Sequence, residues 1–369
     1  MPISAVDCVQ PAIQHTRDQL FRPFRFGQWS RLALVGFLAA ELHTSGCNFN
    51  SFNFPVPQQP RRGQEFLAAP FPHIDPSRIA QFAGLIAAVV VLAIILFFLF
   101  LYINSVFRFI LFDSVVKKRC SISEGWALWH RAGRRYFLWQ IVLLIGEVLF
   151  MGVLIGVPLA VAAMLGWFKD VQQHMGRTVL GVILLIGLVL VFALLAAAVQ
   201  LLAKDFLVPI MALEGVDFAD GWSKLLALIR PEPGKYAVYL LLKIVLAIAA
   251  AILFGIVTLV PILVLVVPAV LAVFAGYKAG LGWNVTTVSL AIVFGAMLLA
   301  VLLYLVALVS VPATVFFPAF SIYFFASRYP QLDALLHPAP PPAAPEPSAL
   351  PESPPPEPPP LPPAPEPIG

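Results

Sequence analysis

Long apolar runs separated by short polar connectors dominate this chain of 369 residues. About 20 apolar residues span a bilayer as a helix, and lipid cannot satisfy an open backbone, so each long run predicts a transmembrane helix. The runs cover residues 29–45, 79–107, 136–165, 178–202, 236–275 and 285–325. The pattern therefore predicts an all-α, polytopic transmembrane helical bundle of about six spans.

Two of these runs leave the number of spans open. The first run is short and contains Glu41, which makes it the weakest of the six. The fifth is too long for one straight span, and we expect Pro261 and Pro268 to kink or end it. Two alternatives follow, a re-entrant half-helix after Pro261 or a seventh span at 262–277. A seventh span would move the C-terminus to the other side of the membrane.

The polar connectors contain a pattern that occurs twice. The first copy has Glu-Gly-Trp ending at Trp126, a basic stretch and then Tyr136. The second has Asp-Gly-Trp ending at Trp222, a basic stretch and then Tyr236. Aromatic and basic residues together are typical of a helix that lies in the headgroup plane. The expected interfacial anchors are Trp126, Trp129, Trp222, Tyr136 and Tyr236.

The two copies favour an architecture of repeated units, each an interfacial amphipathic helix followed by a transmembrane hairpin. Residues 20–29 resemble a degenerate third copy. Helix start signals support the unit, because Ser121 with Glu124 forms a capping-box pattern and Asp217 with Asp220 has the same spacing. The alternative is chance similarity between amphipathic linkers.

The orientation follows from Lys and Arg in the connectors. One side carries 15 of these residues and the other carries 6, so we expect a multi-pass protein of the cell inner membrane with both termini in the cytoplasm. The expected organisation is a cytoplasmic N-terminal amphipathic segment at 1–28, a transmembrane domain at 29–335 and a disordered Pro-rich tail at 336–369.

Composition excludes a soluble protein. The chain is 60% hydrophobic and 11% charged, with a mean hydropathy of +0.90, whereas a soluble domain carries about 25% charged residues. The basic excess beside the apolar runs favours contact with anionic lipid headgroups and not with nucleic acid. The tail from Pro338 onward holds 17 of the 35 prolines, so we expect extended polyproline II. It is either a solubilising spacer or a docking segment for a protein partner.

Glu147 is the candidate intramembrane polar site. It lies about eleven residues into the third run, which is roughly 16 Å by helix rise and close to the bilayer midplane. A carboxyl group there suggests ion or proton handling, and the alternative is a protonated carboxyl that is hydrogen-bonded to another helix. Lys243 is its candidate partner, and the alternative for Lys243 is to extend toward the cytoplasmic headgroups.

Catalytic and cofactor motifs are absent from the sequence. There is no phosphate-binding loop, nucleophile elbow, zinc-protease helix or dinucleotide-binding turn. Cys8, Cys47 and Cys120 have no metal-binding spacing. We therefore expect no cofactor, no metal site and no enzyme activity.

The Gly-Trp connectors, the following Tyr and the ending Phe-Phe-Pro-Ala-Phe at 316–320 resemble uncharacterised bacterial membrane proteins. These are similar to the membrane domain of some glycerophosphodiester phosphodiesterases. The resemblance covers about residues 15–335, and it lacks the soluble catalytic domain. It implies a non-enzymatic membrane protein of envelope or lipid homeostasis, or a membrane scaffold. The alternative is a transporter or permease-like protein with Glu147 in the translocation path.

Overall fold

The computed structural model describes residues 4–41, 76–166, 175–279 and 284–337, and every element within these ranges is a helix. The long helices are α3 (Pro76–Val116), α4 (Ile122–Met164), α5 (Met175–Leu202), α8 (Pro233–Lys278) and α9 (Val285–Ala326). In the described residues, five helical segments are long and apolar enough to cross a membrane. The chain is therefore a helical, multi-pass membrane protein.

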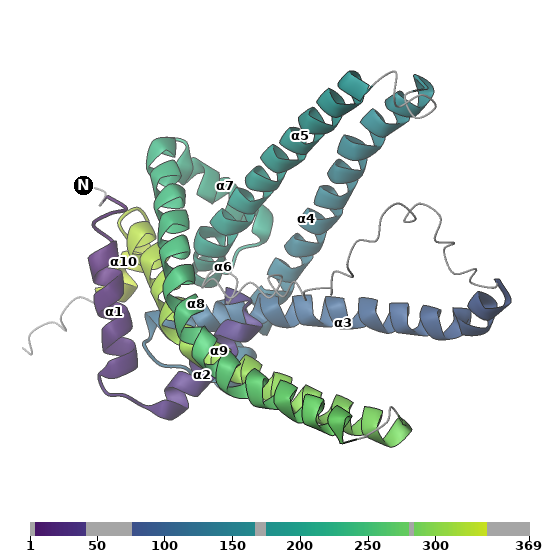
Figure 1. The fold of residues 1–369 in the computed structure, drawn as a ribbon. Helices are drawn as coiled ribbons and strands as arrows, with labels where there is room; N and C mark the ends of the chain where they lie inside the picture. Colours follow the sequence, from purple (N-terminus) through teal and green to yellow (C-terminus); the bar gives the residue numbers. More distant parts are fainter. Residues whose placement is uncertain (1–3, 42–75, 167–174, 280–283, 338–369) are drawn as a thin grey trace, which may run out of the picture.

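The short helices gather at one end of the long ones (Figure 1). They are α1 (Val9–Phe21), α2 (Phe26–Leu38), α6 (Val208–Glu214), α7 (Phe218–Ile229) and α10 (Pro330–Leu336). Helices α1, α2 and α10 all pack on α9, and α2 also packs on α3. The buried core lies at this end, which we call the core end, and both the first and the last described residues belong to it.

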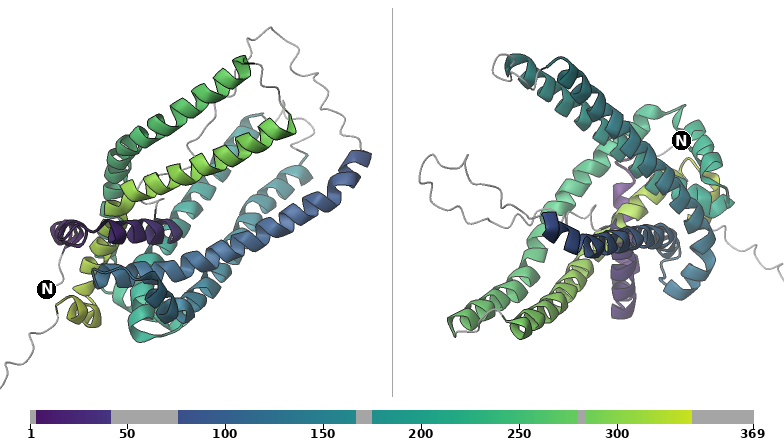
Figure 2. Two further views of the ribbon diagram at one scale, coloured as in Figure 1. Left: turned by 90° about the horizontal axis from the view of Figure 1, so that it is seen from below. Right: turned by 90° about the vertical axis from the view of Figure 1, so that its right-hand side faces the viewer.

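The long helices leave the core end as three arms, namely α3, the α4–α5 hairpin and the α8–α9 hairpin. Figure 2 shows that the outer parts of these arms point in different directions. The most apolar 18-residue windows of α3, α4 and α5 contain no buried residue. The protein thus holds its arms together at one end and leaves their apolar outer surfaces uncovered.

The prediction of a first span at 29–45 is corrected by α2, which has only 13 residues. A helix of that length is about 20 Å long, which is short of the roughly 30 Å hydrocarbon layer. Helix α2 ends at Leu38 beside the core end, where Asn104 Nδ2 donates to the Leu38 carbonyl at 3.1 Å. Residues 42–45 lie outside the described part of the chain, as does Cys47.

The fifth apolar run is one continuous helix. Helix α8 passes through Pro261 and Pro268 without ending, so neither a re-entrant half-helix nor a seventh span forms there. The lost hydrogen bonds at internal prolines are tolerated in long membrane helices because neighbouring groups compensate for them. The expected interfacial helix of the first connector is also not separate, because α4 runs unbroken from Ile122 into the apolar segment. In the second connector α7 is a distinct helix.

Helix α5 continues through a π-helical turn, Ala203–Leu207, into α6. Pro209 explains this turn, since proline has no N–H to donate to the carbonyl four residues earlier and its ring crowds that carbonyl. That residue is Asp205, at the centre of the π-helical turn. Widened turns of this kind are frequent at functional sites. This one carries two adjacent charged residues, Lys204 and Asp205, into the core end.

Candidate functional site

Asp205 forms the best-connected polar contact in the described residues. Lys243 on α8 donates to both of its carboxylate oxygens, at 2.6 and 2.5 Å, and the Tyr239 hydroxyl donates to it at 2.8 Å. Asp205 is 4% exposed and Lys243 is 1% exposed. The Lys243 ammonium also lies 5.8 Å from the Tyr239 ring centre and 6.0 Å from that of Phe317. Ion pairing and cation–π contact together offset the loss of hydration of both charges.

Two further ionic groups lie beside this pair. Glu41, just after α2, pairs with Lys204 on the π-helical turn, and Glu41 is buried. Arg108 on α3 donates to the Tyr136 hydroxyl at 2.8 Å and lies over the Tyr136 ring. We call Glu41, Arg108, Lys204, Asp205 and Lys243 the charged node. Its members come from the segment after α2, from α3, from the π-helical turn and from α8, so it joins all three arms.

A small cavity of about 30 Å³ opens among the five side chains of the charged node. Apolar side chains of α3 and α9, among them Leu111, Phe112, Phe317 and Ile322, form part of its wall. The donors and acceptors that meet here are ammonium, guanidinium and carboxylate groups. Within the described ranges no three His, Cys, Asp or Glu side chains group as metal ligands. The node is thus suited to holding charge and small polar groups inside an apolar shell.

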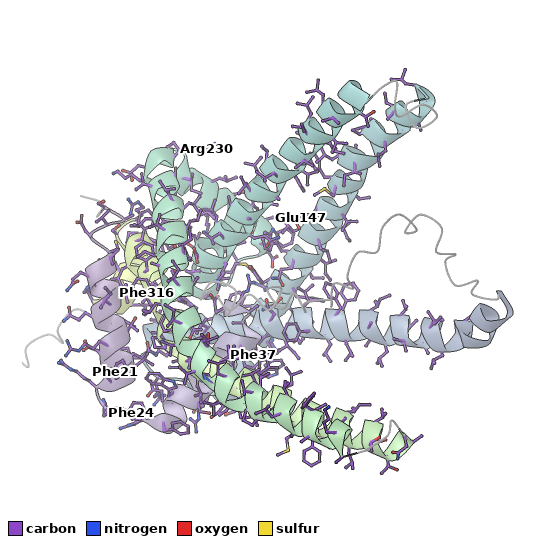
Figure 3. The ribbon with its side chains drawn as sticks, in the orientation of Figure 1. Phe21, Phe24, Phe37, Glu147, Arg230 and Phe316 are labelled. Atoms are coloured by element: carbon purple, nitrogen blue, oxygen red, sulfur yellow. The ribbon has the colours of Figure 1, made fainter. Side chains whose placement is uncertain are left out.

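Glu147 lies elsewhere, on the face of α4 that meets α5 (Figure 3). The Gln200 amide donates to its carboxylate at 2.9 Å, and both side chains line a groove of about 740 Å³ between α4 and α5. Gln200 is four residues before Lys204, near the charged end of the apolar run of α5. Glu147 is therefore paired with a side chain one turn of helix before Lys204 of the charged node.

The structure does not bring Glu147 and Lys243 together. Glu147 bonds to Gln200 and Lys243 bonds to Asp205. The Lys243 side chain is enclosed at the centre of the charged node. The reason is the π-helical turn, which presents Asp205 to α8 at the level of Lys243.

The aromatic residues expected as interfacial anchors lie in two environments. Tyr136 and Tyr236 are enclosed by protein, at 0% and 2% exposure, where each meets a phenylalanine ring edge-on. Trp126 is 36% exposed, and Trp129 and Trp222 are half-buried against the core. Only the tryptophans among these anchors therefore have surface left to meet lipid.

Helix α1 satisfies the carbonyls that end α3. Its buried His15 contacts the Val115 carbonyl through Nε2 at 2.9 Å and the Tyr323 hydroxyl through Nδ1 at 3.2 Å. Gln19 donates to the Ser114 carbonyl at 2.9 Å. The last carbonyls of a helix have no partner within it, so these contacts close the end of α3. Burial lowers the pKa of His15, and it raises the pKa of the nearby Cys8 thiol to about 11.

Sequence reasoning missed most of the charged node. It counted Arg108 and Lys204 only among the basic residues of the connectors that set the orientation. Glu41 served only to weaken the prediction of a first span, and Asp205 was not singled out. The available signal is that Arg108, Lys204 and Lys243 each stand at the end of a long charge-free run, at 79–107, 178–203 and 244–277. The adjacent opposite charges of Lys204 and Asp205, followed by Pro209, mark the π-helical turn.

Comparison with known proteins gives one family. No curated protein and no solved structure matches the chain. A family model described as a family of unknown function, DUF7544, matches residues 3–335, and it carries no link to glycerophosphodiester phosphodiesterases. The match covers every long helix and ends before the Pro-rich tail. With nine-tenths of its length matched, the chain belongs to this family of unknown function, DUF7544.

Proposed function

We propose that this protein is a non-enzymatic membrane scaffold whose charged node joins three apolar arms at the core end and leaves their outer parts separate in the bilayer. The observation that carries the proposal is the contrast between the two ends. The core end is closed by buried ion pairs, whereas the outer surfaces of the arms are covered by no other part of the described chain. Large uncovered apolar surfaces mark contact with lipid or with a partner.

Individual residues of the arms support this reading. Leu149 on α4, Ile186 on α5 and Val273 on α8 are 65%, 60% and 66% exposed. Lipid tails solvate such side chains without cost, so the spans need no bundle of their own to be stable in a membrane. Partner helices or lipids would then occupy the space between arms. A scaffold needs no catalytic group, and its tail at 338–369 supplies a segment for a protein partner.

We place the protein in the inner membrane with its core end at the cytoplasmic face. Most Lys and Arg residues of the connectors belong to the core end, including Lys117, Arg131 and Arg230. The positive-inside rule supports this orientation, and it puts both termini in the cytoplasm. A role in envelope or lipid homeostasis rests on the resemblance to phosphodiesterase membrane domains alone.

The matched connectors support an origin by duplication. Phe109 meets Tyr136 edge-on at 5.9 Å in the first unit, and Phe206 meets Tyr236 edge-on at 5.5 Å in the second. The glycine before each tryptophan admits a side chain of the preceding arm. A Cβ at Gly125 would lie 3.1 Å from Ile110, and one at Gly221 would lie 2.6 Å from Leu207. Each unit thus uses the same Phe–Tyr and Gly–aliphatic contacts.

Complementation tests the scaffold. Cells from which the gene is deleted would be compared for detergent sensitivity after return of the wild type, of Glu147→Ala, or of a chain lacking 338–369. A scaffold predicts that Glu147→Ala restores resistance and that the chain without its tail does not. Loss of function in Glu147→Ala together with full function of the shortened chain would contradict it.

A transporter is the second candidate, and the groove at Glu147 and Gln200 favours it. A polar pair in an apolar arm is costly, and such pairs often mark a transport path. Glu147→Cys in a background without Cys8, Cys47 and Cys120 would be exposed to a membrane-impermeant thiol reagent. Labelling of the folded protein would indicate a water-filled path to position 147. If the reagent labels it from neither side of the membrane, Glu147 is a structural residue and the transporter is excluded.

A further inference from the structure

The charged node has more positive than negative charge. It contains three cations, Arg108, Lys204 and Lys243, against two carboxylates, so one positive charge is in excess. The carboxylates are engaged by the lysines, since Glu41 pairs with Lys204 and Asp205 with Lys243. An excess positive charge at a site that is largely removed from water attracts a counter-ion.

Arg108 is the cation that the described residues leave without a carboxylate. No Asp or Glu oxygen of the described part lies within 4 Å of its guanidinium, whose one hydrogen bond to a side chain goes to the neutral Tyr136 hydroxyl. Arg108 is half-buried and lines the cavity of the charged node, and its buried Nε–H has no acceptor among the described residues. A guanidinium that lines a cavity and has no carboxylate partner favours binding of an external oxyanion.

The cavity gives this oxyanion room. Its volume of about 30 Å³ holds about two water-sized groups. The two unesterified oxygens of a phosphodiester fill that space, and the cavity is partly open, so the rest of the ligand can remain outside. A phosphodiester also carries a single negative charge, which equals the excess charge of the node.

The position of the charged node along the arms favours a lipid headgroup as the source of the phosphate. Arg108 and Lys204 end charge-free runs of α3 and α5 that begin after Arg78 and Arg177. At 1.5 Å per residue these runs are about 40 Å long, which is the thickness of a bilayer including its headgroups. The node therefore lies at the level of headgroup phosphates when the arms cross the membrane.

We propose that the charged node binds the phosphate group of an anionic lipid headgroup, with Arg108 as its principal donor. The proposal rests on the membrane location of the scaffold proposed above and gives its lipid contact a defined site. The lipid would act as a counter-ion that locks the three arms together at the core end. The chemistry is that of a phosphate oxyanion, whether it comes from a lipid or from free phosphate.

Native mass spectrometry and thermal unfolding of the purified full chain test the proposal. The probes are phosphatidylglycerol, a diacylglycerol with the same acyl chains, and inorganic phosphate at about 10 mM against chloride of equal ionic strength. We expect phosphatidylglycerol to stay bound and to raise the melting temperature, with diacylglycerol having no such effect. In Arg108→Gln we expect binding to weaken about tenfold or more, because a hydrogen bond to a charged group is lost.

Arg131→Gln is the matched control, because Arg131 is an exposed arginine of α4 at the core end. It should bind phosphatidylglycerol as the wild type does. Equal binding by wild type and Arg108→Gln would overturn the proposal. If Arg108→Gln does not fold, the wild type alone decides, since a lack of preference for phosphatidylglycerol over diacylglycerol overturns it as well.

Stabilisation by inorganic phosphate that disappears in Arg108→Gln would support the oxyanion site and assign its occupant to free phosphate. The complementation test of the scaffold does not depend on these results. Failure of lipid binding in purified protein with intact complementation would therefore contradict the site and leave the scaffold standing.

Discussion

Asp205 accepts hydrogen bonds from two neighbouring side chains and needs both to be buried without an unpaired charge. Lys243 and Tyr239 donate to it, Tyr239 stacks on Phe320 and Phe324 of α9, and Lys243 lies over the ring of Phe317. Each of these polar groups would be costly to bury alone. At the scale of single residues, the charged node is thus stable only as a complete set.

This dependence predicts a non-additive pair of substitutions. Asp205→Asn or Lys243→Met alone should cost about 3 to 5 kcal/mol of unfolding free energy, because each leaves an unpaired buried charge. The double variant should cost clearly less than the sum of the two. Unfolding in mixed detergent micelles measures all three, and strict additivity would show that the pair is not coupled.

The matched control is the pair of Lys117 with Asp113. It has the same chemistry at 2.8 Å, but the lysine side chain is 56% exposed. Asp113→Asn should cost less than about 1 kcal/mol, since solvent screens an exposed ion pair.

His15 predicts a dependence of stability on pH. Burial lowers its pKa below the ordinary 6.5, and the fold uses the neutral ring, which donates from Nε2 to the Val115 carbonyl and accepts at Nδ1 from Tyr323. The unfolded chain therefore binds the proton more readily. The stabilisation is complete above about pH 6.5 and is lost as the pH falls through that value toward the folded pKa.

Thermal unfolding between about pH 7.5 and about pH 5 measures this effect, because an ordinary histidine titrates within that range. His15→Gln should flatten part of the fall in melting temperature. His130→Gln is the control, because His130 is exposed and should leave the fall unchanged. A fall of equal size in both variants would remove His15 as its cause.

At the scale of elements, the apolar runs predicted the long helices well. The runs at 79–107, 178–202 and 285–325 lie within α3, α5 and α9, because long apolar helices follow from chain and lipid alone. The ends of helices were harder to predict, since Pro261 and Pro268 stay inside α8 and the first connector merges into α4. These outcomes depend on neighbours that a one-dimensional pattern does not contain.

The charged node was harder to predict from the sequence than the ends of the helices. Asp205 meets Lys243 only because the π-helical turn before Pro209 rotates it toward α8, and Arg108 joins them only because α3 passes the same point. Glu147 was conspicuous because its run is otherwise uncharged. The node residues were not, because charges at the ends of apolar runs usually face water or headgroups.

The contact of α3 with α4 predicts a sharp effect at one glycine. A Cβ at Gly133 would lie 2.6 Å from Val106 Cγ2 and 2.8 Å from Val106 Cα. The backbone of α3 would have to move, so Gly133→Ala should cost about 1 to 3 kcal/mol of unfolding free energy.

Gly146→Ala on the same helix is its control, since nothing lies within 4 Å of the added carbon. It should be neutral or stabilising by up to about 1 kcal/mol, because alanine favours helix over glycine. Equal effects of the two substitutions in thermal unfolding would contradict the close approach of α3 and α4.

At the scale of the whole molecule, the protein is asymmetric along its length. Ion pairs, aromatic clusters and the short helices lie at the core end, and the surface of the arms beyond it is mainly apolar (Figures 1 and 2). This distribution fits a molecule whose folded core is at one membrane face and whose arms are solvated by lipid. The central claim is that the core end faces the cytoplasm and the arm tips reach the opposite side.

Labelling of single cysteines in sealed vesicles tests that claim most directly. Arg119→Cys and Arg230→Cys report on the core end, and Lys278→Cys reports on the tip of α8, all in a background without the native cysteines; the three replaced side chains are exposed. A membrane-impermeant thiol reagent should label the first two only from the cytoplasmic side and the third only from the outside. Labelling of all three from one side would contradict the account.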